Sequence, residues 1–171
     1  VSAPEIVRDL HARFAEAGAQ VLETNTFGAS RGVLREYDLE DRVVEINEAA
    51  VALAREAAGH RPDIAIAGAV GPGTRLPSLG QIDVDTLSQA MVEQMGALVG
   101  AGVDALIIET CQDLLQVRTA VRAACDVFEA HGRTLPLLVS VTVEQTGTML
   151  VGSDIAAAAA MLEPFPLFSL G

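Results

Sequence analysis

The segment GAGVDALIIETCQD, residues 100–113, decides the fold. A helix end and a glycine lead into a short apolar strand, which ends in Glu-Thr and a polar loop. The segment EAGAQVLETNTFG, residues 16–28, repeats this order. Two equivalent units that bring Glu-Thr to the same end of a parallel sheet favour a barrel over a doubly wound sheet.

The same alternation of helix and short apolar strand continues on both sides of this segment, as expected when crossover helices bury a parallel sheet. Turn residues and apolar runs predict strands over residues 19–24, 64–70, 104–109, 135–143 and 166–171. Apolar spacing of three and four predicts helices over residues 3–17, 39–58, 84–99, 113–130 and 152–162.

Two local details of these helices can be predicted as well. Ser2 and Glu5 have the spacing of a capping box at the start of the first helix. The inner face of the second helix is expected to consist of apolar residues, namely Val43, Ile46, Ala50, Leu53 and Ala57.

The number of units indicates an incomplete barrel. A full (β/α)8 barrel needs eight strand–helix units and about 250 residues. The chain has 171 residues, begins on a helix and stops in a strand. The predicted fold class is therefore α/β, an incomplete (β/α)8 TIM barrel with roughly strands two to six and their helices. Residues 1–171 are expected to form one partial domain that lacks the first strand.

Composition narrows the possible partners and compartments. The formal net charge of −12 repels nucleic-acid backbones and anionic membrane surfaces, so neither is an expected partner. No apolar run approaches the length of a membrane span, and no export signal is visible. The two cysteines do not form a CxxC pair or a disulfide framework, which fits a reducing cytoplasm best.

Ligand sites of parallel α/β folds form where strands turn into loops. The residues at these positions are Glu23, Thr24, Asn25, Thr26, Gly71, Pro72, Gly73, Glu109, Thr110, Cys111, Ser140, Thr142 and Glu144. No histidine is expected among them. His11 and His131 are expected in helices on the opposite side, and His60 at the amino-terminal end of a strand.

Glu109 is the carboxylate of most interest because four apolar residues precede it. A partly buried carboxylate needs a cation or hydrogen-bond donors. A substrate ammonium would serve, but loop amides or an internal arginine would serve equally. Glu23 occupies the equivalent place in the repeat, but no other feature of the sequence indicates a function for it. The following TNTFG loop, with Asn25 and Phe27, suits a small polar ligand, although local turn bonding explains it as well.

The two cysteines are expected to be packing residues. Cys125 lies on the apolar stripe of its helix. Cys111 follows a strand end, where a zinc ligand or a nucleophile is conceivable. A zinc site needs further ligands, however, and a nucleophile needs a nearby base. Neither accompanies Cys111, so packing under the next helix is favoured.

Four segments together resemble the homocysteine S-methyltransferase family. They are GAQVLETNTFGAS, AGAVGPGTRLPSLG, AGVDALIIETCQDLLQVRTAV and LLVSVTVEQTGTMLVGSDI. The likeness follows the family's order over nearly the whole chain, and it is strongest to the homocysteine-binding module of the cobalamin-dependent members. The LPSLG loop and the TGTML stretch favour these over the betaine-using members, which have an aromatic residue in place of Gly28.

The resemblance implies a barrel in which zinc, held by three cysteines, binds the homocysteine thiol as a thiolate that accepts a methyl group from methylcobalamin. It implies that Glu109 binds the homocysteine amino group and that Thr24 lines the amino-acid pocket. Asn25 and Phe27 are assigned to the same pocket by extension. The alternatives are a betaine- or S-methylmethionine-dependent homocysteine methyltransferase, or an inactive half-barrel with a structural or assembly role.

The chain departs from the family pattern at its zinc ligands. The family cysteines lie in a GxNC segment after the sixth strand and in a later Cys-Cys pair, so they are expected beyond Gly171. Cys111 and Cys125 match none of them. We therefore expect residues 1–171 to be inactive alone, and the full-length protein to carry folate, cobalamin and activation modules.

Overall fold

The five strands form one sheet in the order in which they occur in the chain. The computed structural model describes residues 2–59 and 61–171. The strands are β1 (Val21–Glu23), β2 (Ala65–Val70), β3 (Ala105–Cys111), β4 (Leu137–Val141) and β5 (Ser169–Leu170). Every neighbouring pair is parallel, and the sheet order is β1-β2-β3-β4-β5.

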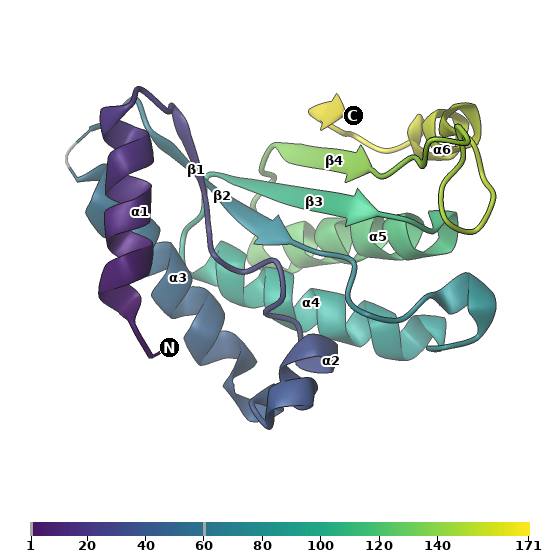
Figure 1. Ribbon diagram of the computed structural model, residues 1–171, viewed down its shortest axis with the longest axis horizontal. Helices are drawn as coiled ribbons and strands as arrows, with labels where there is room; N and C mark the ends of the chain where they lie inside the picture. Colours follow the sequence, from purple (N-terminus) through teal and green to yellow (C-terminus); the bar gives the residue numbers. More distant parts are fainter. Residues whose placement is uncertain (1, 60) are drawn as a thin grey trace.

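Helices connect these strands. The α-helices are α1 (Pro4–Glu16), α2 (Arg31–Leu34), α3 (Val43–Ala58), α4 (Val84–Gly100), α5 (Leu114–His131) and α6 (Ile155–Leu162). Short 3-10 turns are η1 (Arg35–Tyr37), η2 (Glu40–Arg42) and η3 (Pro77–Leu79). Helices α3, α4 and α5 pack along one face of the sheet, while α1 and α6 flank its two ends (Figure 1). No described helix is both long enough and apolar enough to cross a membrane.

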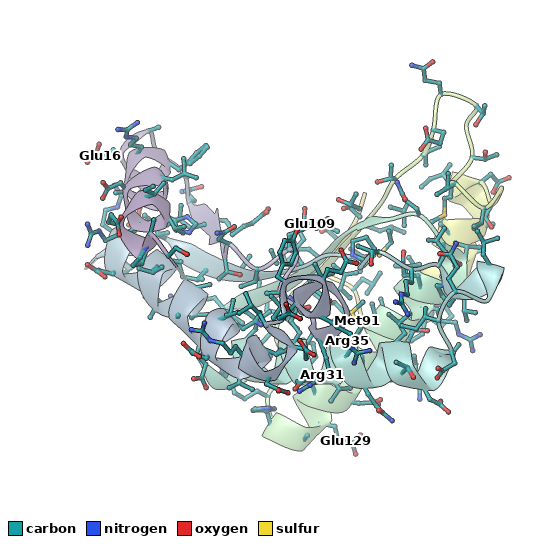
Figure 2. The ribbon with its side chains drawn as sticks, turned by 60° about the horizontal axis from the view of Figure 1, so that its bottom comes forward. Glu16, Arg31, Arg35, Met91, Glu109 and Glu129 are labelled. Carbon is teal, nitrogen blue, oxygen red and sulfur yellow. The ribbon has the colours of Figure 1, made fainter. Side chains whose placement is uncertain are left out.

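The topology confirms the predicted fold class. A doubly wound sheet reverses its strand order and carries helices on both faces. Here each crossover leads to the next strand in sequence, and the helices gather on the convex side of a bent sheet (Figure 2). This arrangement is that of a (β/α)8 barrel segment containing five of its eight strands.

The two faces of the sheet have different side chains. Leu22 pairs with Ile66 across β1 and β2, and Leu106 of β3 pairs with Gly68 of β2. Leu22, Ile66 and Leu106 are all buried in the core cluster. Side chains alternate along a strand, so Glu23, which follows Leu22, and Glu109, which follows the buried Ile108, project from the concave face. The apolar core therefore lies between sheet and helices, and the carboxylates lie inside the curve.

Two details of the helices differ from the sequence predictions. Helix α1 begins after Ala3 without a side-chain cap, so the Ser2–Glu5 capping box is not formed. The buried face of α3 is Val43, Asn47, Ala50, Val51, Ala54 and Ala58. The apolar stripe was predicted about one residue out of place because Asn47 points inward, where its amide donates to the carbonyls of Ala29 (3.0 Å) and Val43 (2.8 Å).

The loop after β2 is fastened to the start of α5 by buried polar groups. The Asp113 carboxylate, fully buried, accepts hydrogen bonds from the Ser78 amide (2.8 Å), the Ser78 hydroxyl (2.6 Å) and the Leu115 amide (2.9 Å). The Gln116 amide donates to the carbonyl of Pro72 (2.9 Å). One carboxylate thus caps α5 and fixes the loop over the mouth of the sheet.

We expect the substitution Asp113→Ala to lower the free energy of unfolding by about 2–3 kcal/mol, because a helix cap and a charge-assisted loop contact are lost together. Urea unfolding measures this effect. The matched control is Asp83→Ala, since Asp83 caps α4 through Thr86 but fastens no loop. An equal loss in both variants would contradict the role of Asp113 in holding the loop.

Candidate functional site

The residues selected from the sequence lie around one cavity. A cavity of about 470 Å³ opens at the carboxyl ends of β1 and β3 and is walled on one side by α1. Glu109, Thr24, Asn25 and Phe27 all line it. Glu109 stands on the concave side of the sheet in Figure 2. The parallel register explains this convergence, because β1 and β3 both pair with β2 and end at the same edge.

Glu109 is a half-buried carboxylate without an internal cation. Within residues 2–59 and 61–171, no arginine forms an ion pair with it and no side chain or amide donates a hydrogen bond to it. Burial raises the pKa of Glu109, and the negative charge of Glu23, which lines the same cavity, raises it further. An ammonium group placed here would compensate both effects.

Thr24 contributes mainly to the structure of the site. Its hydroxyl accepts a hydrogen bond from the Ala69 amide (3.0 Å) and lies 2.6 Å from the hydroxyl of Thr26. The Thr26 hydroxyl donates its one hydrogen to the Ala69 carbonyl (2.6 Å), so Thr24 must donate to Thr26. The hydroxyl hydrogen of Thr24 is therefore used within the protein, which leaves a lone pair of this oxygen for a ligand.

Gly71 and Gln94 hold the backbone of the loop that carries Asn25 and Phe27. The Gly71 amide donates to the Phe27 carbonyl (3.2 Å), and the Phe27 ring lies so close to Gly71 that an added Cβ would be 2.9 Å from two of its carbons. Gln94, fully buried on α4, donates its side-chain amide to the Thr26 carbonyl (2.7 Å). Asn25 and Phe27 remain exposed. The loop thus presents an amide and an aromatic face on a fixed backbone.

Histidine was wrongly excluded from this site. His11 of α1 lines the cavity and is only 7% exposed, and its Nε2 has no hydrogen-bond partner among the described residues. Burial lowers its pKa, which favours the neutral imidazole. The prediction failed because α1 flanks β1 and turns this part of its inner face toward the cavity. His131 ends α5, away from the site, and His60 lies outside the described residues.

Cys111 is a packing residue, as predicted, although it ends β3 and does not follow it. Its side chain is 0% exposed within the core cluster. Burial raises the pKa of its thiol to about 12, and the charges of Asp113 and Glu109 add to this effect. The thiol is therefore protonated at neutral pH, and a protonated thiol is neither a nucleophile nor a zinc ligand.

The described part of the chain does not provide a zinc site. No group of three or more histidine, cysteine, aspartate or glutamate side chains within residues 2–59 and 61–171 is arranged to hold a metal ion. Cys125, which was predicted to be a core residue, is only partly buried and lies outside the core cluster, because Ala124 and Phe128 occupy the buried positions of this part of α5. The donor set that tetrahedral zinc requires is thus not found among these residues.

Thiol labelling tests the assignment of the two cysteines. We expect a disulfide reagent such as Ellman's reagent to modify Cys125 slowly in the folded protein, because burial raises the pKa of that thiol as well. Cys111 should react only after unfolding. Peptide mapping distinguishes the two positions, and modification of Cys111 in the folded protein at the rate of a free thiol would show that it is not a core residue.

Comparison with known proteins identifies the family. The model of the homocysteine S-methyltransferase family matches residues 1–171. The chain belongs to this family. Its relatives include the methionine synthases of Mycobacterium leprae (40% identical) and Mycobacterium tuberculosis (39% identical), each aligned over 98% of this chain. The chain spans 14% of the length of these two relatives.

Solved structures agree with this family membership. The metallated form of the homocysteine methyltransferase MmuM from Escherichia coli superposes with a TM-score of 0.81 at 24% identity. The match covers all of this chain and 63% of that one. The apo form of the same enzyme superposes with a TM-score of 0.73 at 25% identity. The whole of this chain therefore has the fold of the matching part of that enzyme.

Proposed function

We propose that residues 1–171 form the homocysteine-binding part of a zinc-dependent methyltransferase and that Glu109 receives the substrate amino group. The observation that carries the proposal is the convergence of Glu109, Thr24, Asn25 and Phe27 on one cavity, in which the Glu109 carboxylate has no cation of its own among the described residues. Family membership supplies the substrate class.

The residues of the cavity suit the parts of an amino acid. The carboxylates of Glu109 and Glu23 attract an ammonium group, and desolvation around the half-buried Glu109 strengthens this attraction. The Phe27 ring offers an apolar surface for the methylene groups of the substrate. Thr24 and the TNTFG backbone fix the position of this ring relative to Glu109.

Zinc would supply activation of the substrate thiol as a thiolate. Because the described residues do not fit a zinc site, we propose that its ligands come from outside residues 1–171 in the full-length protein. By its likeness to methionine synthases of far greater length, we also propose methylcobalamin as the methyl donor, further modules for folate, cobalamin and activation, and a cytoplasmic location.

Methyl transfer by the full-length protein tests this function. We expect methionine to form from homocysteine and methylcobalamin, but not from homocysteine with betaine or S-methylmethionine. If methionine formed with betaine or S-methylmethionine, that compound and not methylcobalamin would be the methyl donor. Absence of homocysteine binding to the zinc-loaded protein would leave only the structural or assembly role. Stoichiometric tight zinc binding at Cys111 of the 171-residue chain would contradict the assignment of the metal ligands.

A further inference from the structure

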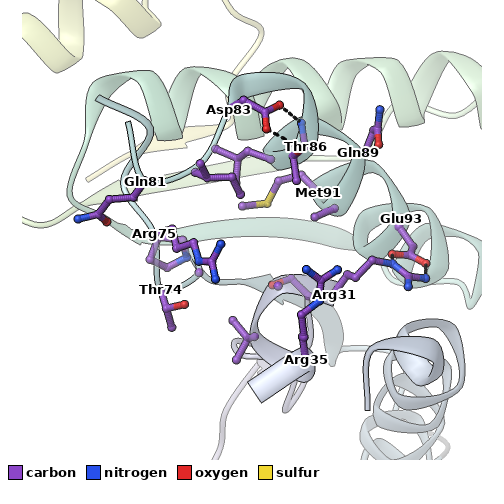
Figure 3. A pocket seen from close by; sticks show the side chains of 18 of the residues that line it. Arg31, Arg35, Thr74, Arg75, Gln81, Asp83, Thr86, Gln89, Met91 and Glu93 are labelled. Carbon is purple, nitrogen blue, oxygen red and sulfur yellow. Dashed lines mark hydrogen bonds and ion pairs between the residues drawn. The ribbon is translucent and has the colours of Figure 1, made fainter. Parts of the chain in front are cut away.

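A second and larger cavity lies apart from the homocysteine site. It has a volume of about 840 Å³ and is formed by α2, the loop between β2 and α4, and the first turns of α4 (Figure 3). It shares no lining residue with the cavity around Glu109. Its volume is within the range of sites that enclose small organic molecules.

Three arginines meet at this cavity in a chain whose net charge is −12. Arg31 is turned away to Glu93, which accepts two of its hydrogen bonds (2.8 and 2.6 Å). Arg35 and Arg75 form no ion pair with any acid in the described part of the chain. Both reach into the cavity, Arg35 from η1 and Arg75 from the loop after β2 (Figure 3).

The two acids that line this cavity, Glu93 and Asp83, already accept hydrogen bonds from the protein. Glu93 is held by Arg31, and Asp83 accepts hydrogen bonds from the amide and the hydroxyl of Thr86 (2.8 and 2.7 Å) at the start of α4. Asp83 keeps its negative charge but is turned to the start of α4, whereas Arg35 and Arg75 are cations of this cavity that form no ion pair among the described residues. Two such groups match a dianion better than a single carboxylate, and guanidinium binds phosphate oxygens in a bidentate manner.

An apolar wall completes the cavity. Leu87 and Met91 of α4 are 4% and 1% exposed, and Ile82 lies beside them. These residues can cover the apolar body of a ligand while the arginines bind its charge. We propose that this cavity binds a small organic molecule carrying a phosphate group, with the phosphate between Arg35 and Arg75 and the body against Ile82, Leu87 and Met91.

Calorimetry on the full-length protein with adenosine 5′-monophosphate as the probe tests this site. Inorganic phosphate probes the contact with the arginines alone, and adenosine probes the contact with the apolar wall alone. We expect the monophosphate to bind more tightly than either. The variant Arg35→Ala/Arg75→Ala should lose roughly 10- to 100-fold in affinity for it, since two charge-assisted contacts are removed.

The matched control is Arg118→Ala/Arg122→Ala, which removes the same charge from exposed positions of α5. This control should keep the affinity for the monophosphate. Homocysteine binding should be unchanged in both double variants, which separates this site from the function proposed above. No measurable binding of the monophosphate, or an equal loss in both double variants, would overturn the proposal. If inorganic phosphate bound as tightly as the monophosphate, the apolar wall would not contribute to binding, which would contradict that part of the proposal.

Discussion

The substitution Glu109→Gln in the full-length protein is expected to weaken homocysteine binding by roughly 10- to 100-fold without changing the zinc content. Glutamine preserves the shape of the side chain but removes the charge that attracts the substrate ammonium, and a partly desolvated charged contact of this kind is worth about 1.5–3 kcal/mol. Calorimetry measures the affinity and metal analysis the zinc. Loss of zinc with unchanged affinity would mean that Glu109 serves the metal.

The pH dependence of binding gives this prediction a second readout. The ammonium binds the ionised carboxylate, so the affinity of the wild-type protein should fall as the pH drops through the pKa of Glu109. Burial and Glu23 raise that pKa, and the fall should begin at a higher pH than for an ordinary glutamate. Glu109→Gln should lack this transition. Glu129→Gln, an equal charge change on the exposed face of α5, should retain both the transition and the affinity.

The substitution Gly71→Ala is expected to destabilise the protein by about 1–3 kcal/mol and to weaken homocysteine binding as well. An added Cβ would lie 2.6 Å from the Phe27 carbonyl oxygen and 2.9 Å from two carbons of its ring. Backbone cannot yield as a side chain can, so the TNTFG loop must shift. Urea unfolding and calorimetry measure the two effects.

Gly96→Ala is the matched control for this substitution. Gly96 lies inside α4, and a Cβ there would meet no atom within 4 Å. Alanine is favoured over glycine within a helix by roughly 0.5–1 kcal/mol, so this variant should be more stable than the wild type and bind homocysteine equally well. A Gly71→Ala variant with wild-type stability and affinity would show that Phe27 does not depend on Gly71.

The order and type of the main elements follow from local sequence features, because glycines, prolines and apolar periodicity mark where each strand and long helix begins and ends. The face that a helix buries follows less directly. Asn47 is an example: its amide finds two carbonyl acceptors, one of them on the Ala29 loop, so a polar side chain replaces the expected apolar one. Nothing in the helix itself indicates where that loop will lie.

Some residues of the candidate site could likewise be predicted from the sequence, and others could not. Glu109, Thr24, Asn25 and Phe27 could be selected because strand ends of a parallel sheet converge. His11 and Gln94 could not be selected in this way, because their roles in the site depend on how α1 and α4 pack beside the sheet. The available signal for Gln94 was its place in the helix, three positions after Met91 and directly before Met95. The compensation of Arg31 by Glu93, 62 positions later, likewise depends on tertiary packing.

A comparison of homocysteine with 4-sulfanylbutanoate, which lacks only the amino group, tests the central claim most directly. Both compounds are titrated into the wild-type full-length protein and into Glu109→Gln, and the four affinities form a cycle. If Glu109 receives the amino group, the wild-type protein prefers homocysteine strongly, and the variant binds both compounds with nearly equal, weak affinity. If the variant keeps the wild-type preference for homocysteine, Glu109 does not receive the amino group.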